Sequence, residues 1–288
     1  MVIDKVTTWG QALDYTFQTR HTWRHGAGAK PAAINCGHFT RLRGRSLPVA
    51  KISPALMSQV SIELEEEGKS DGTINRVVSA VSTVLNHCAF DELIPTPSRF
   101  RRRKELTHRL TWFSQDEVEQ FVYVSLNTFD RKDLADISLT AAYTGMRMGE
   151  LFKLKAQDVD LGTGSIFVGG RPGFGTKNGD YRVLPIHDRI KDILCLRMEN
   201  APANLSLFGD EWNDKDQLLR AFKKSRNLMG KDETYVFHSF RHSFGTWLAE
   251  KNVAIRTIMD LMGHKRVETT LRYAKCTDQA RTAAIDLI

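Results

Sequence analysis

A proline-rich break followed by a run of basic residues divides the sequence about one third of the way along. Pro95 and Pro97 cannot lie inside a helix, because proline lacks an amide donor and restricts the residue before it. Residues 99–104 then read RFRRRK, with five positive charges in six positions. This pattern predicts two domains, residues 1–97 and 111–288, joined by a basic linker over residues 98–110.

Before the break, apolar residues recur at the spacing of helices. Trp9, Leu13 and Phe17 are four residues apart, and Ser53 with Pro54 is a typical helix start. From Ile74 to Leu85 the apolar residues recur at intervals of three and four, after Ser70 or Asp71 as the cap. The first domain is therefore predicted to be a small helical bundle.

After the break, helical patterns give way near Val159 to short alternating segments. Turn signals such as Asn178-Gly179 separate about three strands, over residues 159–161, 165–168 and 181–186. Helical patterns then resume over residues 188–199, 214–229, 239–251, 255–262, 267–273 and, in a tail 274–288, over 277–288. The fold class that follows is mainly α with a small antiparallel β-sheet (α+β).

Composition narrows the class of protein. Hydrophobic residues make up 41% and charged residues 26% of the 288, which is typical of a globular chain with a buried core. No apolar run approaches the ~20 residues of a membrane helix, and the N-terminus does not resemble a secretory signal. The four cysteines are scattered, which argues against a zinc ribbon or a disulfide scaffold and favours a reducing, intracellular compartment.

The net charge of +7 is concentrated in the first third, which holds 15 basic and 10 acidic residues up to position 105. A basic run attracts phosphates through counterion release, whatever the base sequence. The alternative for such a run is a solvated linker.

Two glycine-containing segments carry candidate cations. In TGMRMGEL the glycines allow a sharp turn that places Arg147 at a helix start, with Glu150 three residues later. Lys177 precedes the Asn178-Gly179 turn, where a hairpin tip can carry an ammonium group into a groove. The alternatives are a surface ion pair for Arg147 and a solvated side chain for Lys177.

Further candidates lie near the C-terminus. His238 and Arg241 share a helical face, and His238 with His242 has the spacing of a zinc pair. Ser239 occupies the position where helical zinc motifs have glutamate, and no third ligand is evident, so a zinc hydrolase is the last-ranked alternative. His264 follows a glycine that ends a helix, and Tyr273 lies nine residues further on.

Together these residues, in this order, resemble the tyrosine recombinases, the phage integrase family. The phrases that carry the resemblance are TGMRMGEL, TKNGDYRVLPI, HSFRHSFGTWL and LMGHKRVETTLRYA. SDGTINRVVSAVSTVLNHCA also looks like the last helix of the family's core-binding domain. The resemblance implies a helical core-type DNA-binding domain followed by a catalytic domain, and a site-specific recombinase that integrates or excises a phage or another mobile element.

The resemblance also implies the chemistry. Tyr273 would attack a DNA phosphodiester and form a 3′-phosphotyrosine, leaving a free 5′-hydroxyl. Arg147 and Arg241 would clamp the non-bridging oxygens with bidentate hydrogen bonds, and His264 would donate another. Because a free tyrosine has a pKa of ~10, the arginines must favour its phenolate.

The remaining roles concern protons. The resemblance makes His238 the candidate acceptor of the tyrosine proton and Lys177 the general acid for the leaving oxygen, while Glu150 would orient Arg147. No metal and no cofactor are expected, because the cations supply the positive field and the phosphotyrosyl bond conserves the energy of the broken bond.

The expected partner is double-stranded DNA, bound by a homotetramer in which a C-shaped clamp surrounds each duplex, with accessory DNA-bending or directionality proteins. We expect the protein to be cytoplasmic, associated with the nucleoid of a bacterial host, and to lack the arm-binding domain of many integrases. The residues expected to contact DNA outside the catalytic centre are Asn75, Arg76, Ser79, Arg101, Arg102, Arg103 and Lys104.

Other outcomes of the same active site stay open at this point. They are an Xer-like dimer resolvase, a telomere resolvase and a type IB topoisomerase. A DNA-binding protein that has lost catalysis is disfavoured, because every residue of the expected catalytic set is present. The tail 274–288 has apolar residues that suit packing on a neighbouring subunit or on its own domain.

Overall fold

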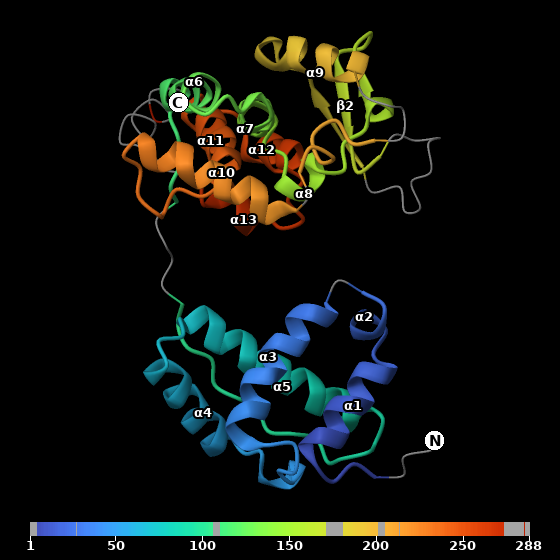
Figure 1. Ribbon diagram of the computed structural model, residues 1–288. Helices are drawn as coiled ribbons and strands as arrows, with labels where there is room; N and C mark the ends of the chain where they lie inside the picture. The colour runs from blue at the N-terminus through green and yellow to red at the C-terminus, as the bar shows by residue number, and fades with distance from the viewer. Residues whose placement is uncertain are drawn as a thin grey trace. The chain divides into compact units, whose positions relative to one another are not determined.

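The computed structural model describes residues 5–26, 28–105, 110–170, 181–200, 205–212, 214–273 and 285. The chain forms two compact units, residues 1–108 and 109–288 (Figure 1). Within the described ranges, no helix combines the length and the apolar character that crossing a membrane requires.

The first unit is a bundle of helices around α5 (Figure 1). Helix α5, the last helix of this unit, contacts α1, α3 and α4, and its buried valines fill the space between them. Its predicted cap is confirmed, since the Ser70 hydroxyl accepts a hydrogen bond from the amide of Thr73. The elements of this unit are α1 (Trp9–Thr19), α2 (His21–Arg24), α3 (Ala29–Arg43), η1 (Val49–Lys51), α4 (Pro54–Glu66) and α5 (Asp71–Phe90).

The sequence patterns did not predict α2 and α3. The α3 helix buries only Ala32, Cys36 and Phe39, so its apolar stripe is narrow and consists partly of small residues. Pro31 also lies in its first turn, where proline is tolerated because the first amides of a helix have no partner in the helix.

The second unit is mostly helical and contains a small sheet, which confirms the predicted fold class. Its helices are α6 (Gln115–Asn127), α7 (Lys132–Thr144), α8 (Met148–Leu151), α9 (Asp188–Asn200), α10 (Lys215–Leu228), α11 (Ser239–Glu250), α12 (Ile255–Met262) and α13 (Val267–Leu271), with a 3-10 turn η2 (Ala156–Asp158). The predicted tail helix over residues 277–288 lies outside the described residues, apart from Ile285.

Helix α7 forms the centre of this unit. It contacts α6, α9, α10 and α11, and it is buried along nearly its whole length. Beside it, the rings of Phe113, Phe121, Phe222 and Phe240 pack together in stacked and edge-on pairs. Phe240 lies on α11, the helix that also carries Arg241, and Arg147 lies three residues after the end of α7.

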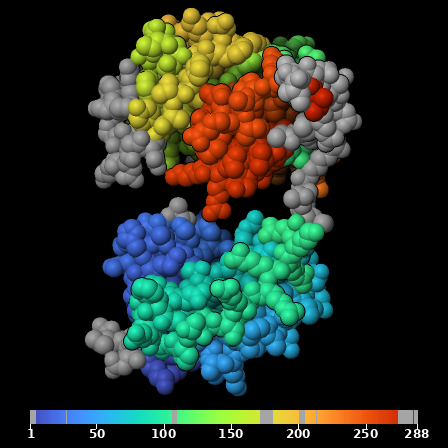
Figure 2. All heavy atoms as spheres, turned by 180° about the vertical axis from the view of Figure 1, so that it is seen from behind, coloured from blue at the N-terminus to red at the C-terminus, as the bar shows by residue number. Residues whose placement is uncertain are grey.

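The sheet has three antiparallel strands in the order β1 (Val159–Asp160), β2 (Ser165–Val168) and β3 (Arg182–Pro185). Ile166 pairs with Leu184 and is fully buried, whereas Val168 pairs with Arg182 at the end of the sheet. Strand β3 contacts α12, and Figure 2 shows the yellow-green atoms of the sheet beside the orange-red atoms of the last helices. This contact brings Arg182 to the site.

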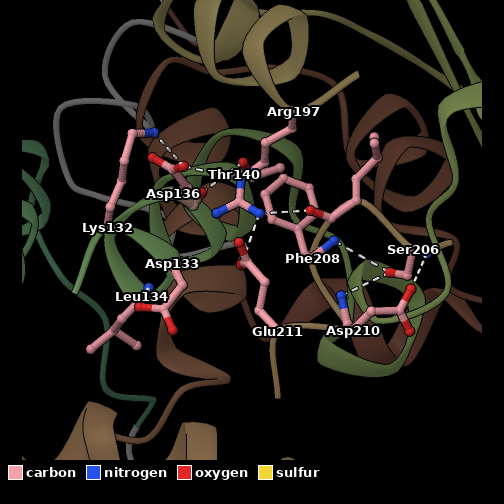
Figure 3. Close-up of polar contacts among 12 residues, drawn as sticks. Lys132, Asp133, Leu134, Asp136, Thr140, Arg197, Ser206, Phe208, Asp210 and Glu211 are labelled. Atoms are coloured by element: carbon pink, nitrogen blue, oxygen red, sulfur yellow. Dashed lines mark hydrogen bonds and ion pairs between the residues drawn. The ribbon is translucent and has the colours of Figure 1, made fainter. Parts of the chain in front are cut away.

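A partly enclosed ion cluster joins α7, α9 and the turn after residue 205 (Figure 3). The Arg197 guanidinium donates to Asp136 Oδ2 at 3.0 Å, to Glu211 Oε2 at 2.9 Å and to the Leu207 carbonyl at 2.7 Å. The side chains of Arg197 and Asp136 are only 10% and 8% exposed. Because buried charges are stable only when paired, the cluster fixes the spacing of these three segments.

Candidate active site

Arg147 lies just after a sharp turn that ends α7. Gly145 has a φ of 62°, the left-handed conformation that glycine adopts readily, and a β-carbon there would lie 2.5 Å from the Phe244 ring. The backbone then extends at Arg147, whose side chain is 44% exposed. Its guanidinium donates to Glu150 Oε1 at 3.0 Å and to the Gly263 carbonyl at 3.2 Å.

Glu150 also forms an ion pair with an arginine of the sheet, Arg182 on β3. Arg182 donates to its two carboxylate oxygens at 3.1 and 2.8 Å, and the Arg147 amide donates at 2.7 Å. Burial alone would raise the pKa of Glu150, but the guanidinium of Arg182, helped by that of Arg147, lowers it to about 2. The carboxylate is therefore ionised at neutral pH and orients both arginines.

Arg241 projects from α11 between the two glycine turns. The residue is 2% exposed and donates to the Gly145 carbonyl and, at 2.6 Å, to the Met262 carbonyl. Burial and then the charge of Arg147 lower its pKa to about 10, so it is still cationic at neutral pH. Arg147 and Arg241 thus meet at the turn formed by residues 262 and 263.

The two predicted histidines border these arginines. His264 follows Gly263, which has a φ of 63°, and its Nδ1 lies 2.8 Å from Thr270 Oγ1. His238 precedes α11, and part of the residue is exposed. The surrounding protein atoms, followed by the charges of Arg241 and Arg147, lower the pKa of both histidines to about 4, so both rings are neutral at pH 7.

Tyr273 is the last described residue of this region and is only 5% exposed. Its hydroxyl lies 2.8 Å from His242 Nδ1, and its ring is parallel to that of His264 at a centroid distance of 6.4 Å. Burial raises the pKa of the phenol, and the charges of Arg241 and Arg272 act in the opposite direction. The hydroxyl therefore carries its proton in this structure.

The structure thus brings together Arg147, Arg241, His264 and Tyr273, with His238 at the start of the same helix as Arg241. Lys177 lies outside the described residues. Two site residues were missed by sequence reasoning. The sequence signal for Arg182 was its place in the predicted strand YRVLPI, close to Lys177. His242 was considered only as a zinc ligand.

Metal binding has no geometric support in the part of the chain that the structure describes. There, no three histidine, cysteine, aspartate or glutamate side chains lie close enough to hold a metal ion. His238 and His242 lie near each other, with ring centroids 4.8 Å apart, and Nδ1 of His242 is already bonded to Tyr273.

A cavity of about 800 Å³ opens beside Arg147. Its wall contains Lys153, Lys155 and Lys215, and it extends to Gly169 and Gly170 after β2. The carboxylate of Glu150 is held by Arg147 and Arg182, and Asp158 is buried. The cavity therefore presents mainly positive charge, continuous with the exposed side of Arg147.

The basic segment predicted to be a linker lies partly against the first unit. Asn75 is 7% exposed. Its side-chain amide donates to the Arg103 carbonyl and accepts from the Arg103 amide, both at 2.9 Å, and it also donates to Glu105 at 2.8 Å. Arg103 pairs with Glu65 at 2.8 Å and with Asp71 at 3.2 Å. The structure thus gives Asn75 and Arg103 an internal role, and their contact with DNA stays a prediction.

The other predicted DNA contacts in this unit differ in exposure. Ser79 is half-buried and donates to the Asn75 carbonyl at 2.6 Å. The other four predicted contacts, Arg76, Arg101, Arg102 and Lys104, are exposed, and no ion pair is found for them among the described residues.

Comparison with known proteins identifies similar sequences. The model of the phage integrase family matches residues 111–280. A tyrosine recombinase named XerA from Pyrococcus horikoshii is 31% identical over 234 residues, covering 78% of this chain and 76% of the relative. Another XerA, from Thermococcus kodakarensis, is 32% identical over 221 residues and covers 74% of each chain.

Solved structures share the fold. An integrase of the transposon Tn1549, in complex with transposon right end DNA, superposes with a TM-score of 0.80 at 16% identity, covering 97% of this chain and 99% of the other. A lambda integrase dimer bound to a COC′ core site gives a TM-score of 0.73 at 17% identity, covering 96% and 79%. The likeness therefore extends over both units of the chain.

Proposed function

Because this chain belongs to the phage integrase family of tyrosine recombinases and is a site-specific DNA strand-transfer enzyme, we propose that Tyr273 is its nucleophile. The phenol oxygen forms a bond to the phosphorus of a DNA phosphodiester, and the bond from phosphorus to the 5′-oxygen breaks. The products are a 3′-phosphotyrosine and a 5′-hydroxyl, which can reverse the step on the same or another strand.

The observation that carries this assignment is the convergence of two guanidinium groups on one turn. Arg147 donates to the carbonyl of Gly263 and Arg241 donates to that of Met262, directly before His264. Two guanidinium groups held together in this way can bind the non-bridging oxygens of one phosphate and stabilise the negative charge that develops during attack.

The fixed charges of the site support this role. Glu150 is held by both Arg147 and Arg182, so it orients Arg147 and leaves its exposed side available to a phosphate. His264 is neutral at pH 7, so its imidazole can donate one hydrogen bond without adding charge. In this proposal His238 accepts the tyrosine proton and Lys177 protonates the leaving oxygen.

The partner in this proposal is double-stranded DNA, with a homotetramer exchanging strands between two duplexes and accessory proteins setting the direction. The lysines in the wall of the cavity beside Arg147 suit phosphates next to the one that is cleaved. In the first unit, the exposed side chains of Arg76, Arg101, Arg102 and Lys104 supply further contacts with the DNA backbone.

We propose integration or excision of a mobile element as the biological reaction. Resolution of chromosome dimers is the second candidate, because both relatives described above are named XerA. The DNA that the protein holds covalently distinguishes the two, since one reaction uses the ends of a mobile element and the other a chromosomal site.

The test is covalent trapping on nicked suicide duplexes cut from the host genome, followed by sequencing of the attached DNA. Wild-type protein should form a protease-sensitive, detergent-resistant adduct, and Tyr273→Phe should bind DNA equally well without forming one. An adduct that persists in Tyr273→Phe would remove Tyr273 from the role of nucleophile.

A further inference from the structure

The hydroxyl of Tyr273 forms a hydrogen bond with a histidine outside the expected catalytic set. His242 Nδ1 lies 2.8 Å from the phenol oxygen, whereas His264 contacts the same tyrosine only through parallel rings. His242 follows Arg241 directly on α11. One short segment of helix therefore holds both Arg241, which is proposed to bind the phosphate, and the hydrogen-bond partner of Tyr273.

The tyrosine ring is also fixed from the side. Gly245, three residues after His242 on α11, leaves the space that the ring occupies, because a β-carbon there would lie 2.9 Å from Cζ of Tyr273 and 2.9 Å from Sδ of Met262. Tyr273 packs in a small apolar cluster with Ile258 and Met262 of α12. The packing restricts the plane of the ring, and the bond to His242 fixes the hydroxyl.

The protonation states allow the Tyr273 hydroxyl to donate this hydrogen bond. Burial, followed by the positive charge of neighbouring groups, lowers the pKa of His242 to about 4, so the imidazole is neutral at pH 7. The phenol keeps its proton, since burial raises its pKa. A neutral imidazole carries one ring proton, so Nδ1 of His242 can accept from the hydroxyl when that proton is on Nε2.

We propose that His242 is a positioning residue for the nucleophile: its Nδ1 accepts the hydrogen bond of the Tyr273 hydroxyl and holds the oxygen ready for attack on phosphorus. The inference rests on the proposed role of Tyr273. It requires an acceptor at the position of Nδ1, and it does not require His242 to take up the proton.

Two substitutions of His242 distinguish the effect of the hydrogen-bond acceptor from the effect of the ring. His242→Asn places an amide oxygen close to the position of Nδ1, whereas His242→Phe keeps a ring of similar size without an acceptor. Each variant is measured as the full-length protein, with excess enzyme on a nicked suicide duplex, so that a single covalent attachment is followed. DNA affinity and thermal unfolding are measured in parallel.

We expect His242→Phe to slow attachment by about 10- to 100-fold at unchanged DNA affinity, because a misplaced nucleophile loses its alignment. His242→Asn should recover the rate to within about threefold of wild type. Equal rates in wild type and His242→Phe, or an Asn variant as slow as the Phe variant while folding normally, would overturn the positioning role. Since wild type and Tyr273→Phe test the nucleophile itself, these outcomes leave the proposed function standing.

Discussion

Arg182 donates hydrogen bonds to both carboxylate oxygens of Glu150, at 3.1 and 2.8 Å, and so connects strand β3 to the helix start that carries Arg147. Its Nε also donates to the Leu261 carbonyl at 2.9 Å, at the end of α12. A single side chain thus connects three segments beside Arg147: strand β3, the start of α8 and the end of α12.

We expect Arg182→Ala to slow covalent attachment about tenfold, because Glu150 would then draw the guanidinium of Arg147 more strongly away from a phosphate. The measurement is single-turnover adduct formation at saturating DNA. The matched control is Arg189→Ala, which removes an arginine whose pair with Glu119 is exposed. A rate in Arg182→Ala equal to that of the control would show that Glu150 needs no second partner.

Gly245→Ala tests the fit of the tyrosine ring against α11. The added methyl group would meet Tyr273 and Met262 at 2.9 Å, so we expect a loss of about 2 kcal/mol in the free energy of unfolding of the second unit and slower attachment. Gly37→Ala in α3 is the control, because its added methyl group would meet no atom within 4 Å beyond the nearby backbone of its own helix. That variant should gain up to ~1 kcal/mol from helix propensity.

Much of this site was predictable from the sequence because the turns and helix starts are local. Gly145 and Gly263 end helices in left-handed conformations, as their positions after apolar helical patterns indicate, and the arginine and histidine that follow them lie in the site. The family resemblance then supplied the grouping, which no local pattern contains.

The rest depends on contacts between distant segments. Arg182 reaches Glu150 only because β3 packs against α12, and its position on a strand does not reveal that contact. His242 has the spacing of a zinc ligand relative to His238, and only the position of Tyr273 shows its actual partner. Asn75 lies on a helical face predicted to approach DNA, yet its amide binds the chain that leaves the bundle.

The free energy of unfolding of the DNA-free protein should fall as the pH decreases from about 6.5 to 4. A histidine in the unfolded chain titrates near pH ~6.5, whereas His242 and His264 in the folded protein have a pKa of about 4. Between these values the unfolded chain binds more protons, so acid favours unfolding. Glu150, with a folded pKa of about 2, extends the loss below the ordinary glutamate pKa.

Denaturant titrations at several pH values measure this slope. His242→Asn removes one of the groups, so its stability should depend less steeply on pH between 4 and 6.5 than that of wild type. An unchanged slope would mean that His242 titrates normally in the folded protein.

Asp136→Ala should destabilise the second unit by about 3 kcal/mol, because it leaves the buried guanidinium of Arg197 with one carboxylate fewer (Figure 3). Thermal or denaturant unfolding measures the change. Asp260→Ala serves as the comparison, since it breaks an exposed pair with Arg256 on α12 and should cost less than ~1 kcal/mol. Equal effects of the two substitutions would show that the cluster contributes no more than a surface ion pair.

The basic run near the end of the first unit contains both exposed and ion-paired arginines. Arg101 and Arg102 are exposed, whereas Arg103 donates to Glu65, Asp71 and the Ser61 carbonyl. If the exposed pair contacts phosphates, Arg101→Gln with Arg102→Gln should weaken binding to every DNA sequence and reduce the slope of log affinity against log salt by about 1.8. Arg103→Gln should leave that slope near its wild-type value and lower the free energy of unfolding of the first unit by about 1 kcal/mol. Filter-binding titrations over a range of salt concentrations and unfolding curves test both parts, and a slope that falls only in Arg103→Gln would reverse the assignment.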